Sequence, residues 1–240
     1  MQLREAREDD CKTIYEWRID PISQEMFINN RYISFSDHYE WFHNSLKNNS
    51  RCLYIGEIER ERIGISRFDF LSKTNEVEVS INLNPKFRGK GFAKDFLLSA
   101  IDLFEIEKEC VMYARIKVEN IPSKKLFENA GFKLLKKKEN LLIYKRSKSN
   151  ISFREVNEDD EDLLFDLLRN RIYSISHKSM PSFENHREFV KSNPYLYWYL
   201  VFNNKQVIGT FYIKDDNSIG MNILNPSLII IKKILYYINH

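Results

Sequence analysis

Two glycines separated by one residue lie beside two cations in the segment Arg88-Gly89-Lys90-Gly91-Phe92-Ala93. Glycines let successive backbone N–H groups point into one concavity, and a ligand can approach because no Cβ is in the way. A helix that begins near Phe92 would add the positive end of its dipole at the same place. With the charges of Arg88 and Lys90, this combination suits a pyrophosphate, although a short Gly-x-Gly is also typical of an ordinary turn.

The spacing of these glycines disfavours two common phosphate sites. The segment lacks the form Gly-x-x-x-x-Gly-Lys-Ser/Thr and no βαβ unit opens the chain, so neither a nucleoside triphosphate loop nor a Rossmann site is favoured. Metal chemistry is not indicated either, because Cys11, Cys52 and Cys110 are far apart and show no Cys/His metal spacing. We therefore expect a site for a pyrophosphate-containing ligand and no metal.

The elements that must position this turn are predicted from hydrophobic periodicity. Residues 76–83 alternate, with Val77, Val79, Ile81 and Leu83 on one face and Glu76, Glu78, Ser80 and Asn82 on the other. Further strands are predicted at 2–7, 51–58, 62–70, 111–118 and 141–144, and helices at 9–18, 36–47, 92–104 and 123–129. This order of strands and helices is that of an α/β (α+β) protein.

The chain also repeats itself, because Leu3–Asp10 recurs as Phe153–Asp160. Later matches follow in the same order: Trp17-Arg18 with Leu168-Arg169, Phe35–His38 with Phe183–His186, Arg62–Gly64 with Val207–Gly209, and Asn84-Pro85 with Asn225-Pro226. The second copy has no counterpart of the glycine turn, so only the first copy can perform its chemistry. We expect domains at 1–147 and 151–240, with the boundary in the polar stretch 147–150.

Bulk composition excludes several functional classes. The 240 residues are 43% hydrophobic with a formal charge of +3, which indicates a folded chain and gives no sign of nucleic-acid or membrane binding. The run Lys136–Lys138 is interpreted as a solvated turn. The charged N-terminus lacks the apolar region of a signal peptide, and the apolar stretch Leu228–Ile231 is too short to span a bilayer. Unpaired cysteines favour a reducing cytoplasm.

Two segments of the first copy resemble the motifs of the GNAT superfamily of N-acetyltransferases. Arg88-x-x-Gly91-x-Ala93 is similar to its pyrophosphate-binding pattern, Gln/Arg-x-x-Gly-x-Gly/Ala, and Asn120–Phe132 is similar to its second motif. The resemblance implies a mixed central sheet flanked by helices over residues 1–147, followed by an incomplete GNAT-like repeat. It also implies acetyl-CoA as cosubstrate, its pyrophosphate held by the backbone of Arg88, Gly89, Lys90, Gly91, Phe92 and Ala93, with Asn120 and Ser123 lining the pantetheine and adenosine side.

Acetyl transfer needs a neutral amine, a donor for the thioester oxygen and a route for the departing thiolate. By the resemblance, a backbone N–H near Leu83 faces that oxygen, and Glu78 stands where many GNAT enzymes have their general base. Glu78 is equally typical of an outward charge on a half-exposed sheet. Phe127 lines the cofactor site where many relatives have a tyrosine acid, so the acid is Tyr144 or Tyr113, or the thiolate leaves unassisted.

The region from Glu16 to Phe42 is similar to nucleotide-sugar N-acetyltransferases of the pseudaminic acid pathway. Those enzymes acetylate the 4-amino group of a UDP-linked 4-amino-4,6-dideoxy sugar, and the resemblance implies that Arg18 and His38 contact this substrate. Ile19 and Asn82 depart from the pattern. The alternatives are a protein N-terminus or small amine as acceptor, and a non-catalytic acyl-CoA-binding or scaffold protein. A homo-oligomer is compatible with all of them.

Residues 151–240 keep Arg169 and His186, the counterparts of Arg18 and His38, without a cofactor turn. They form a binding module, a structural half-domain that covers a sheet edge, or the start of a copy truncated in this chain. We expect the structural role.

Overall fold

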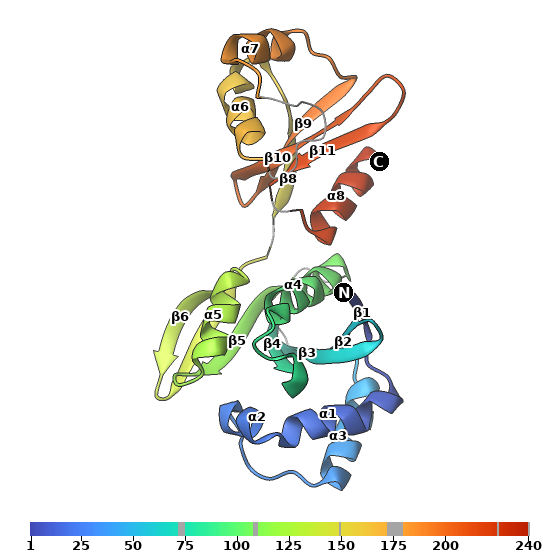
Figure 1. Ribbon diagram of the computed structural model, residues 1–240, viewed down its shortest axis with the longest axis vertical. Coiled ribbons are helices and arrows are strands. Elements are labelled where there is room, and N and C mark those ends of the chain that lie inside the picture. The colour runs from blue at the N-terminus through green and yellow to red at the C-terminus, as the bar shows by residue number, and fades with distance from the viewer. Residues whose placement is uncertain (72–74, 108–109, 149, 172–179, 225, 240) are drawn as a thin grey trace. The chain divides into compact units, whose positions relative to one another are not determined.

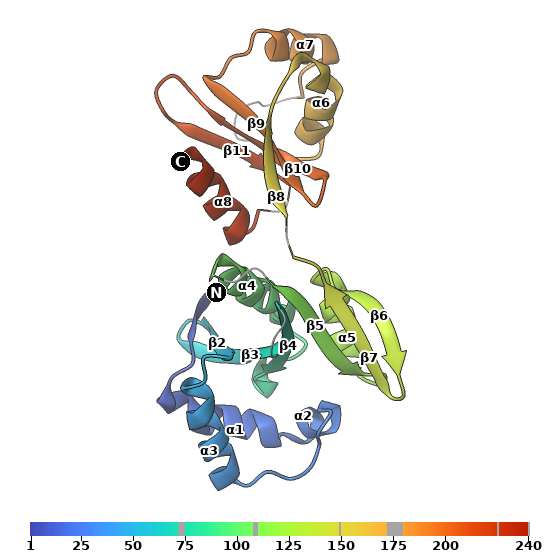
Figure 2. The same ribbon diagram turned by 180° about the vertical axis from the view of Figure 1, so that it is seen from behind.

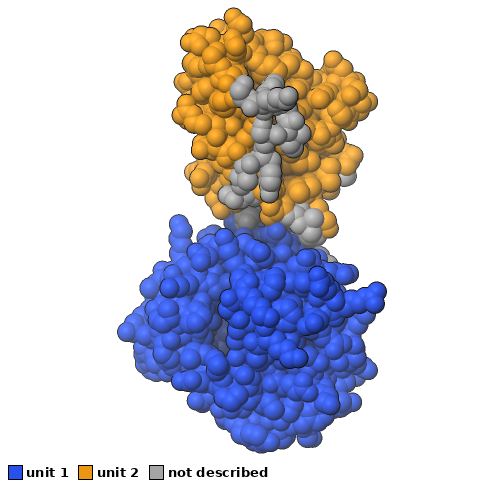
Figure 3. Space-filling model, viewed as in Figure 1, with its two compact units in different colours: residues 1–148 blue, residues 149–240 orange. Residues whose placement is uncertain are grey.

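The computed structural model describes residues 1–71, 75–107, 110–148, 150–171, 180–224 and 226–239. It divides into two compact units, residues 1–148 and residues 149–240, which are coloured blue and orange in Figure 3. Two residues used in the repeat analysis, Ser149 and Asn225, lie outside the described residues. Within the described ranges, no helix combines the length and the apolar character that crossing a bilayer requires.

Unit 1 is built on a mixed sheet with the strand order β1-β2-β3-β4-β5-β7-β6. The strands are β1 (Gln2–Glu5), β2 (Arg51–Ile58), β3 (Glu61–Leu71), β4 (Glu76–Leu83), β5 (Val111–Lys117), β6 (Lys133–Lys138) and β7 (Leu141–Arg146). Strands β4 and β5 run parallel, whereas the other neighbours are antiparallel. The predicted mixed α/β architecture is therefore confirmed for this unit.

Helices cover both faces of this sheet (Figures 1 and 2). On one side lie α1 (Cys11–Ile19), α2 (Pro21–Met26) and α3 (Phe35–Leu46), and on the other lie α4 (Phe92–Glu107) and α5 (Ile121–Asn129). Short 3-10 helices, η1 (Glu8–Asp10) and η2 (Pro85–Phe87), precede α1 and the glycine turn. The glycine turn thus joins a central strand to the helix that covers it.

Two hydrophobic cores hold the helices on the sheet. The larger core lies on the α4 side and includes Val77, Val79, Leu97, Ile101, Phe104, Met112 and Tyr144. The smaller core lies on the α1 and α3 side and includes Ile14, Trp17, Phe42, Leu53, Ile55 and Ile65. Because each strand turns alternate side chains to opposite faces, both cores follow from the period-two pattern of the sequence.

One α-helix and one strand of unit 1 were not predicted. Helix α2 has only six residues and no apolar periodicity, and Pro21 with the cap residue Asp20 specifies where it begins. Strand β6 contains the run Lys136–Lys138, so the interpretation of that run as a solvated turn is wrong. All side chains of β6 are exposed, so the strand is specified by its pairing with β7 and not by an alternating pattern.

Unit 2 contains β8 (Ile151–Glu155), α6 (Glu161–Arg169), α7 (Phe183–Lys191), β9 (Tyr197–Asn203), β10 (Gln206–Ile213), β11 (Ile219–Ile223) and α8 (Leu228–Ile238). A short 3-10 helix, η3 (Glu158–Asp160), precedes α6, and its sheet has the order β11-β10-β9-β8. One ion pair has the same form in both units. Arg4 Nη2 donates to Asp10 Oδ1 at 2.8 Å, and Arg154 Nη2 donates to Asp160 Oδ1 at 2.6 Å.

Candidate active site

The glycine turn has the backbone that a ligand cradle requires. Gly89 and Gly91 have φ values of 72° and 86°, in the left-handed region that glycine adopts without strain. A Cβ added to either glycine would meet no atom within 4 Å, so the turn is open on the side where side chains are missing. Helix α4 begins directly afterwards at Phe92 and presents the unpaired N–H groups of its first turn. The predicted strand–turn–helix order is confirmed.

Strands β4 and β5 separate next to this turn. Their parallel register comprises Glu76 with Val111, Val77 with Met112, and Glu78 with Tyr113. Beyond Glu78, strand β4 continues to Leu83 without a further register partner on β5, although both stretches are described. A gap therefore opens between two central strands at the end where the glycine turn lies.

The backbone N–H of Leu83 points toward this gap. Asn84 N–H donates to the carbonyl of Ile63 at 2.9 Å, so Asn84 and the alternate residues before it bond to β3. Leu83 and Ile81 lie between those residues, and their amides face the opposite strand, β5. Val111 N–H at the start of β5 donates to the Asn75 carbonyl at 3.0 Å, so another odd-numbered residue of this stretch also directs its backbone toward β5. Leu83 is thus oriented to donate to an oxygen in the gap.

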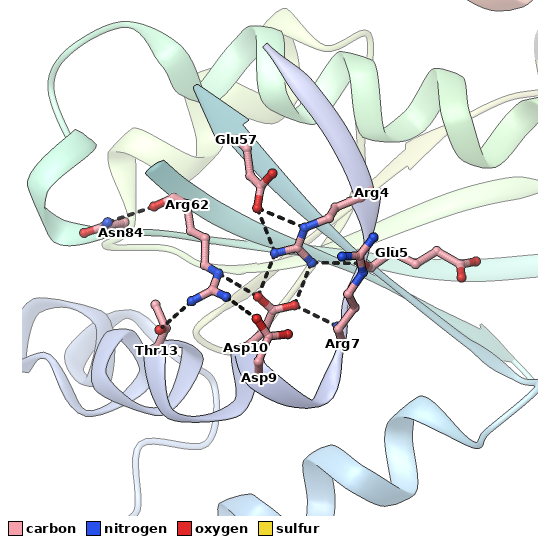
Figure 4. Close-up of polar contacts among 9 residues, drawn as sticks. All are labelled: Arg4, Glu5, Arg7, Asp9, Asp10, Thr13, Glu57, Arg62 and Asn84. Carbon is pink, nitrogen blue, oxygen red and sulfur yellow. Dashed lines mark hydrogen bonds and ion pairs between the residues drawn. The ribbon is translucent and has the colours of Figure 1, made fainter. Parts of the chain in front are cut away.

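The end of β4 is linked to β3 and η1 by a partly buried polar network (Figure 4). Asn84 Nδ2 donates to the carbonyl of Arg62 at 2.9 Å, and the Arg62 guanidinium binds Asp10 at 2.8 Å. The Asp10 side chain is 0% exposed, and Arg4 also binds it. Burial raises the pKa of Asp10, but its bonds to Arg4 and the Arg7 N–H outweigh burial and lower it overall. The carboxylate therefore stays charged and fixes the strand end.

Arg88 does not direct its charge toward the turn. Its Nη1 lies 2.7 Å from Asp20 Oδ2, and its Nη2 donates to Ser23 Oγ at 2.6 Å. The Arg88 charge is therefore shared with Asp20, and its expected contribution to a pyrophosphate site stays a prediction. The backbone of Arg88 still belongs to the turn. Lys90 lies with its Nζ 5.2 Å from the centroid of the Phe87 ring.

Charged side chains cover the sheet face opposite α4. Glu78 on β4 accepts from Arg115 on β5, with Nε to Oε1 and Nη2 to Oε2 both 2.9 Å. Arg67 on β3 pairs with Asp69 at 2.9 Å. The guanidinium carbons of Arg67 and Arg51 lie 5.9 Å and 5.5 Å from the centroid of the Trp41 ring. Glu78 is 16% exposed and belongs to this charged face.

Arg18 faces the same cluster from α1. Its guanidinium lies 3.8 Å above the ring of Phe27 and donates to the Asn29 carbonyl at 2.7 Å. Among the described residues, no carboxylate lies within ion-pair distance of Arg18. Burial lowers the pKa of Arg18, and the positive charge of Arg67 lowers it further, so the two cations are near each other. An anion is the natural complement of this arrangement.

His38 lies in the core and not at a surface. The ring is 3% exposed, and its Nε2 is 3.2 Å from the carbonyl oxygen of Cys11. In unit 2, His186 Nε2 is likewise 3.2 Å from the carbonyl oxygen of Glu161. The ring therefore packs between α3 and α1, and its expected contact with a substrate stays a prediction.

The second motif positions α5. Asn120 Oδ1 accepts from the N–H of Ser123 at 3.1 Å, so Asn120 caps the helix. Phe127 is 3% exposed, and its ring centroid lies 5.0 Å from that of Phe132. Asn120 and Ser123 are therefore brought together at the start of α5, whereas Phe127 points into the core.

The two tyrosines considered as acids have different environments. Tyr144 is 1% exposed and donates to Glu128 Oε1 at 2.8 Å, and burial, followed by that bond, raises its pKa to about 12. The Tyr144 hydroxyl is thus bonded within the core, and its role as the acid stays a prediction. Tyr113 donates to Glu76 Oε1 at 2.8 Å on the charged face.

Several residues of the site were not identified from the sequence. Arg67 and Arg115 lie in the predicted strands 62–70 and 111–118, and charged residues at these positions could have predicted a charged face of the sheet. Asp20 precedes a proline, which indicates a helix cap but not its ion pair with Arg88. Within the described part of the chain, no group of three or more His, Cys, Asp or Glu residues is placed to hold a metal ion.

Comparisons with known proteins agree with this geometry. The family described as Acetyltransferase (GNAT) domain matches residues 1–133. A domain from Methanocaldococcus jannaschii DSM 2661 is 26% identical, with a TM-score of 0.51 over 60% of this chain and 96% of that one. Spermidine N-acetyltransferase from Vibrio cholerae, in complex with CoA and spermine, is 18% identical, with a TM-score of 0.53 over 60% of this chain and 92% of that one. This second similarity concerns the fold alone, and no curated protein sequence matches the chain.

Proposed function

The chain belongs to the GNAT family of acetyltransferases, and from this premise we propose that unit 1 transfers the acetyl group of acetyl-CoA to an amine. The observation that carries the proposal is the open glycine turn, with two left-handed glycines at the start of α4 and a gap between β4 and β5 beside it. Acetyl-CoA supplies the activated acyl group. The residues fit it, because the turn offers backbone N–H groups and open space to a diphosphate.

The residues around the gap suggest how the reaction proceeds. We assign Glu78 as the base that accepts a proton from the attacking amine, since it lies at the last paired position before the strands separate. The Leu83 N–H donates to the acyl oxygen while negative charge develops on it, a contribution of about 3–4 kcal/mol for one well-placed donor. Phe127 has no proton to give, and the hydroxyls of Tyr144 and Tyr113 are engaged with Glu128 and Glu76, so in this proposal the thiolate leaves without a side-chain acid.

The acceptor is best described as an amine that carries anionic groups. Arg18 has no carboxylate partner in the described ranges, and Arg67 lies close enough to depress its pKa. An arginine without a carboxylate partner is a suitable ligand for a diphosphate. We therefore propose the 4-amino group of a UDP-linked 4-amino-4,6-dideoxy sugar as acceptor, with Arg18 binding the diphosphate. The nucleotide-sugar resemblance of the Glu16–Phe42 region supports the same acceptor.

A two-part experiment tests the function. Calorimetric titration of the full chain with acetyl-CoA should give heat of binding, and its absence would remove the acyl-transfer proposal. Thiol release from acetyl-CoA should then be measured with the UDP-4-amino sugar, with spermidine and with an N-terminal peptide. Turnover only with spermidine would replace the nucleotide-sugar acceptor, and CoA binding without turnover on any amine would favour a non-catalytic acyl-CoA-binding protein.

We further propose that residues 151–240 are a partial second copy that does not bind CoA. The shared Arg–Asp ion pair, the shared histidine contact and the equivalent order of elements through β11 support this interpretation. Strand β11 is followed by Ser227 and α8 without a Gly-x-Gly sequence. The unit should fold without CoA, and removal of CoA should leave its unfolding transition unchanged.

A further inference from the structure

Helix α2 is held by polar bonds more than by apolar packing. The helix has six residues, and Ser23 is the buried one. Of its two large apolar side chains, Ile22 is 59% exposed and Met26 is half-buried. A helix this short is unstable without outside support, so the groups that bind it determine its position.

Those groups come from both sides of the gap. Ser23 Oγ donates to Asn82 Oδ1 on β4 at 3.1 Å, and Lys117 Nζ on β5 donates to the Glu25 carbonyl at 2.7 Å. Asn82 Nδ2 also donates to the Trp17 carbonyl at 3.2 Å, which links the same strand to α1. Helix α2 therefore spans the two strands that separate next to the glycine turn.

The glycine turn is bound to this helix through Arg88. One edge of the guanidinium meets Asp20, and its other amino group donates to Ser23 Oγ. Asp20 simultaneously caps α2 by accepting from the Ser23 N–H at 2.9 Å. The Arg88 and Asp20 side chains are 27% and 19% exposed, so solvent screens their attraction only in part.

We propose that Asp20, Ser23 and Arg88 form a bonded group, here called the positioning node, that links the glycine turn to α2. Through this node, binding of a ligand at the turn would order α2 on the acceptor side of the gap. This inference rests on the proposed function, since it takes CoA as the ligand of the turn. A ligand that fixes the backbone at Arg88 narrows the positions open to its guanidinium, which binds the cap and the first turn of α2. Cofactor binding thereby prepares the acceptor side, and Asp20 and Ser23 act through Arg88 without touching either substrate.

The test uses the full chain and CoA as the probe. Amide hydrogen exchange of residues 21–27 is measured with and without saturating CoA in the wild type, Asp20→Asn, Ser23→Ala and Asp9→Asn. Asparagine keeps a capping oxygen but removes the charge that pairs with Arg88. Asp9→Asn is the matched control, because Asp9 pairs with Arg62 at 2.6 Å outside the node.

CoA should slow exchange of α2 about fivefold or more in the wild type and in Asp9→Asn, the size of a typical coupling between sites. Asp20→Asn and Ser23→Ala should still bind CoA, but CoA should no longer slow the exchange of α2. The first variant removes the charge that pairs with Arg88, and the second removes the Oγ that accepts from Arg88. Unchanged exchange in the wild type on CoA binding, or full slowing in both node variants, would overturn the node while leaving the acetyltransferase proposal intact. Absence of CoA binding to the wild type, measured by calorimetry on the same sample, removes both.

Discussion

The carboxylate of Glu78 and the guanidinium of Arg115 form a two-point ion pair, with both nitrogen–oxygen distances at 2.9 Å. The pair joins β4 to β5 at the last point before the strands diverge. Arg115 orients the carboxylate by binding both of its oxygens. Glu78 is thus held in one orientation at the edge of the gap.

Glu78→Gln should lower kcat by about 10²–10⁴-fold, the usual contribution of a positioned base, because the amide cannot accept the amine proton. The rate at high pH should recover partly, where more of the amine is already neutral. Steady-state rates between pH 6 and pH 10 measure both effects. Glu76→Gln is the control, since Glu76 binds the Tyr113 hydroxyl, and an equal loss in both variants would contradict the assignment.

Gly91→Ala should weaken CoA binding about tenfold, equivalent to about 1.4 kcal/mol. A Cβ at this left-handed position strains the turn by about 1–2 kcal/mol and intrudes on the open side. Gly131→Ala is the matched control, because Gly131 has a φ of 84° in a turn after α5. Both variants should lose similar thermal stability, and calorimetry should show weakened binding only for Gly91→Ala. Equal CoA affinity in the two variants would argue against the turn as the site.

Tyr144→Phe should keep kcat near the wild-type value and lower the free energy of unfolding by about 0.5–1.5 kcal/mol, the typical worth of a hydrogen bond. The reason is that the Tyr144 hydroxyl is buried and bonds Glu128 in the core. Urea unfolding and steady-state kinetics measure the two quantities. A fall in kcat with loss of the basic limb of the pH profile would restore Tyr144 as the acid.

The backbone of the site was largely predictable from local pattern. Alternation through Val77, Val79 and Ile81 predicts β4 and its core face, and the spacing of Gly89 and Gly91 predicts the turn. Both features follow from properties of neighbouring residues, so they are visible in a short stretch of sequence. The order of elements around them was predicted for the same reason, apart from α2 and β6.

Side-chain partners were not predictable in this way. Arg88 precedes the turn and was expected to serve a phosphate, yet it pairs with Asp20, a residue far away in the sequence. His38 near a helix start was compatible with a surface role, but the packing of α3 on α1 turns the ring inward. Such choices depend on where distant elements meet, and local periodicity carries no information about that.

Arg18→Gln should lower kcat/KM for the UDP-4-amino sugar about 10–100-fold, as expected for loss of a charge-assisted bond worth about 1.5–3 kcal/mol. The KM for acetyl-CoA should be unchanged, because Arg18 lies on the acceptor side. Arg31→Gln, an exposed arginine in the following loop, is the control. Rate measurements at two salt concentrations should show a smaller salt effect for Arg18→Gln only. If both variants behave alike, Arg18 does not bind the acceptor.

Stability should fall as the pH drops below about 6.5 because of two buried histidines. Burial lowers the pKa of His38 and of His186 below the ordinary value of 6.5, while their carbonyl bonds oppose this in part. The folded chain therefore keeps both rings neutral at a pH where the unfolded chain binds protons. The stabilisation is complete above pH 6.5, and it is lost as the pH falls toward the lowered values.

Urea unfolding between pH 5 and pH 8 measures this effect, with a slope of up to about 1.4 kcal/mol per pH unit from each histidine. His38→Gln and His186→Gln keep a nitrogen donor near the position of Nε2 but do not titrate, so each should flatten the pH dependence. The effect of His38→Gln belongs to unit 1 and that of His186→Gln to unit 2, because the two rings bind carbonyls of different units. A slope that persists in the double variant would show that other groups control the acid response.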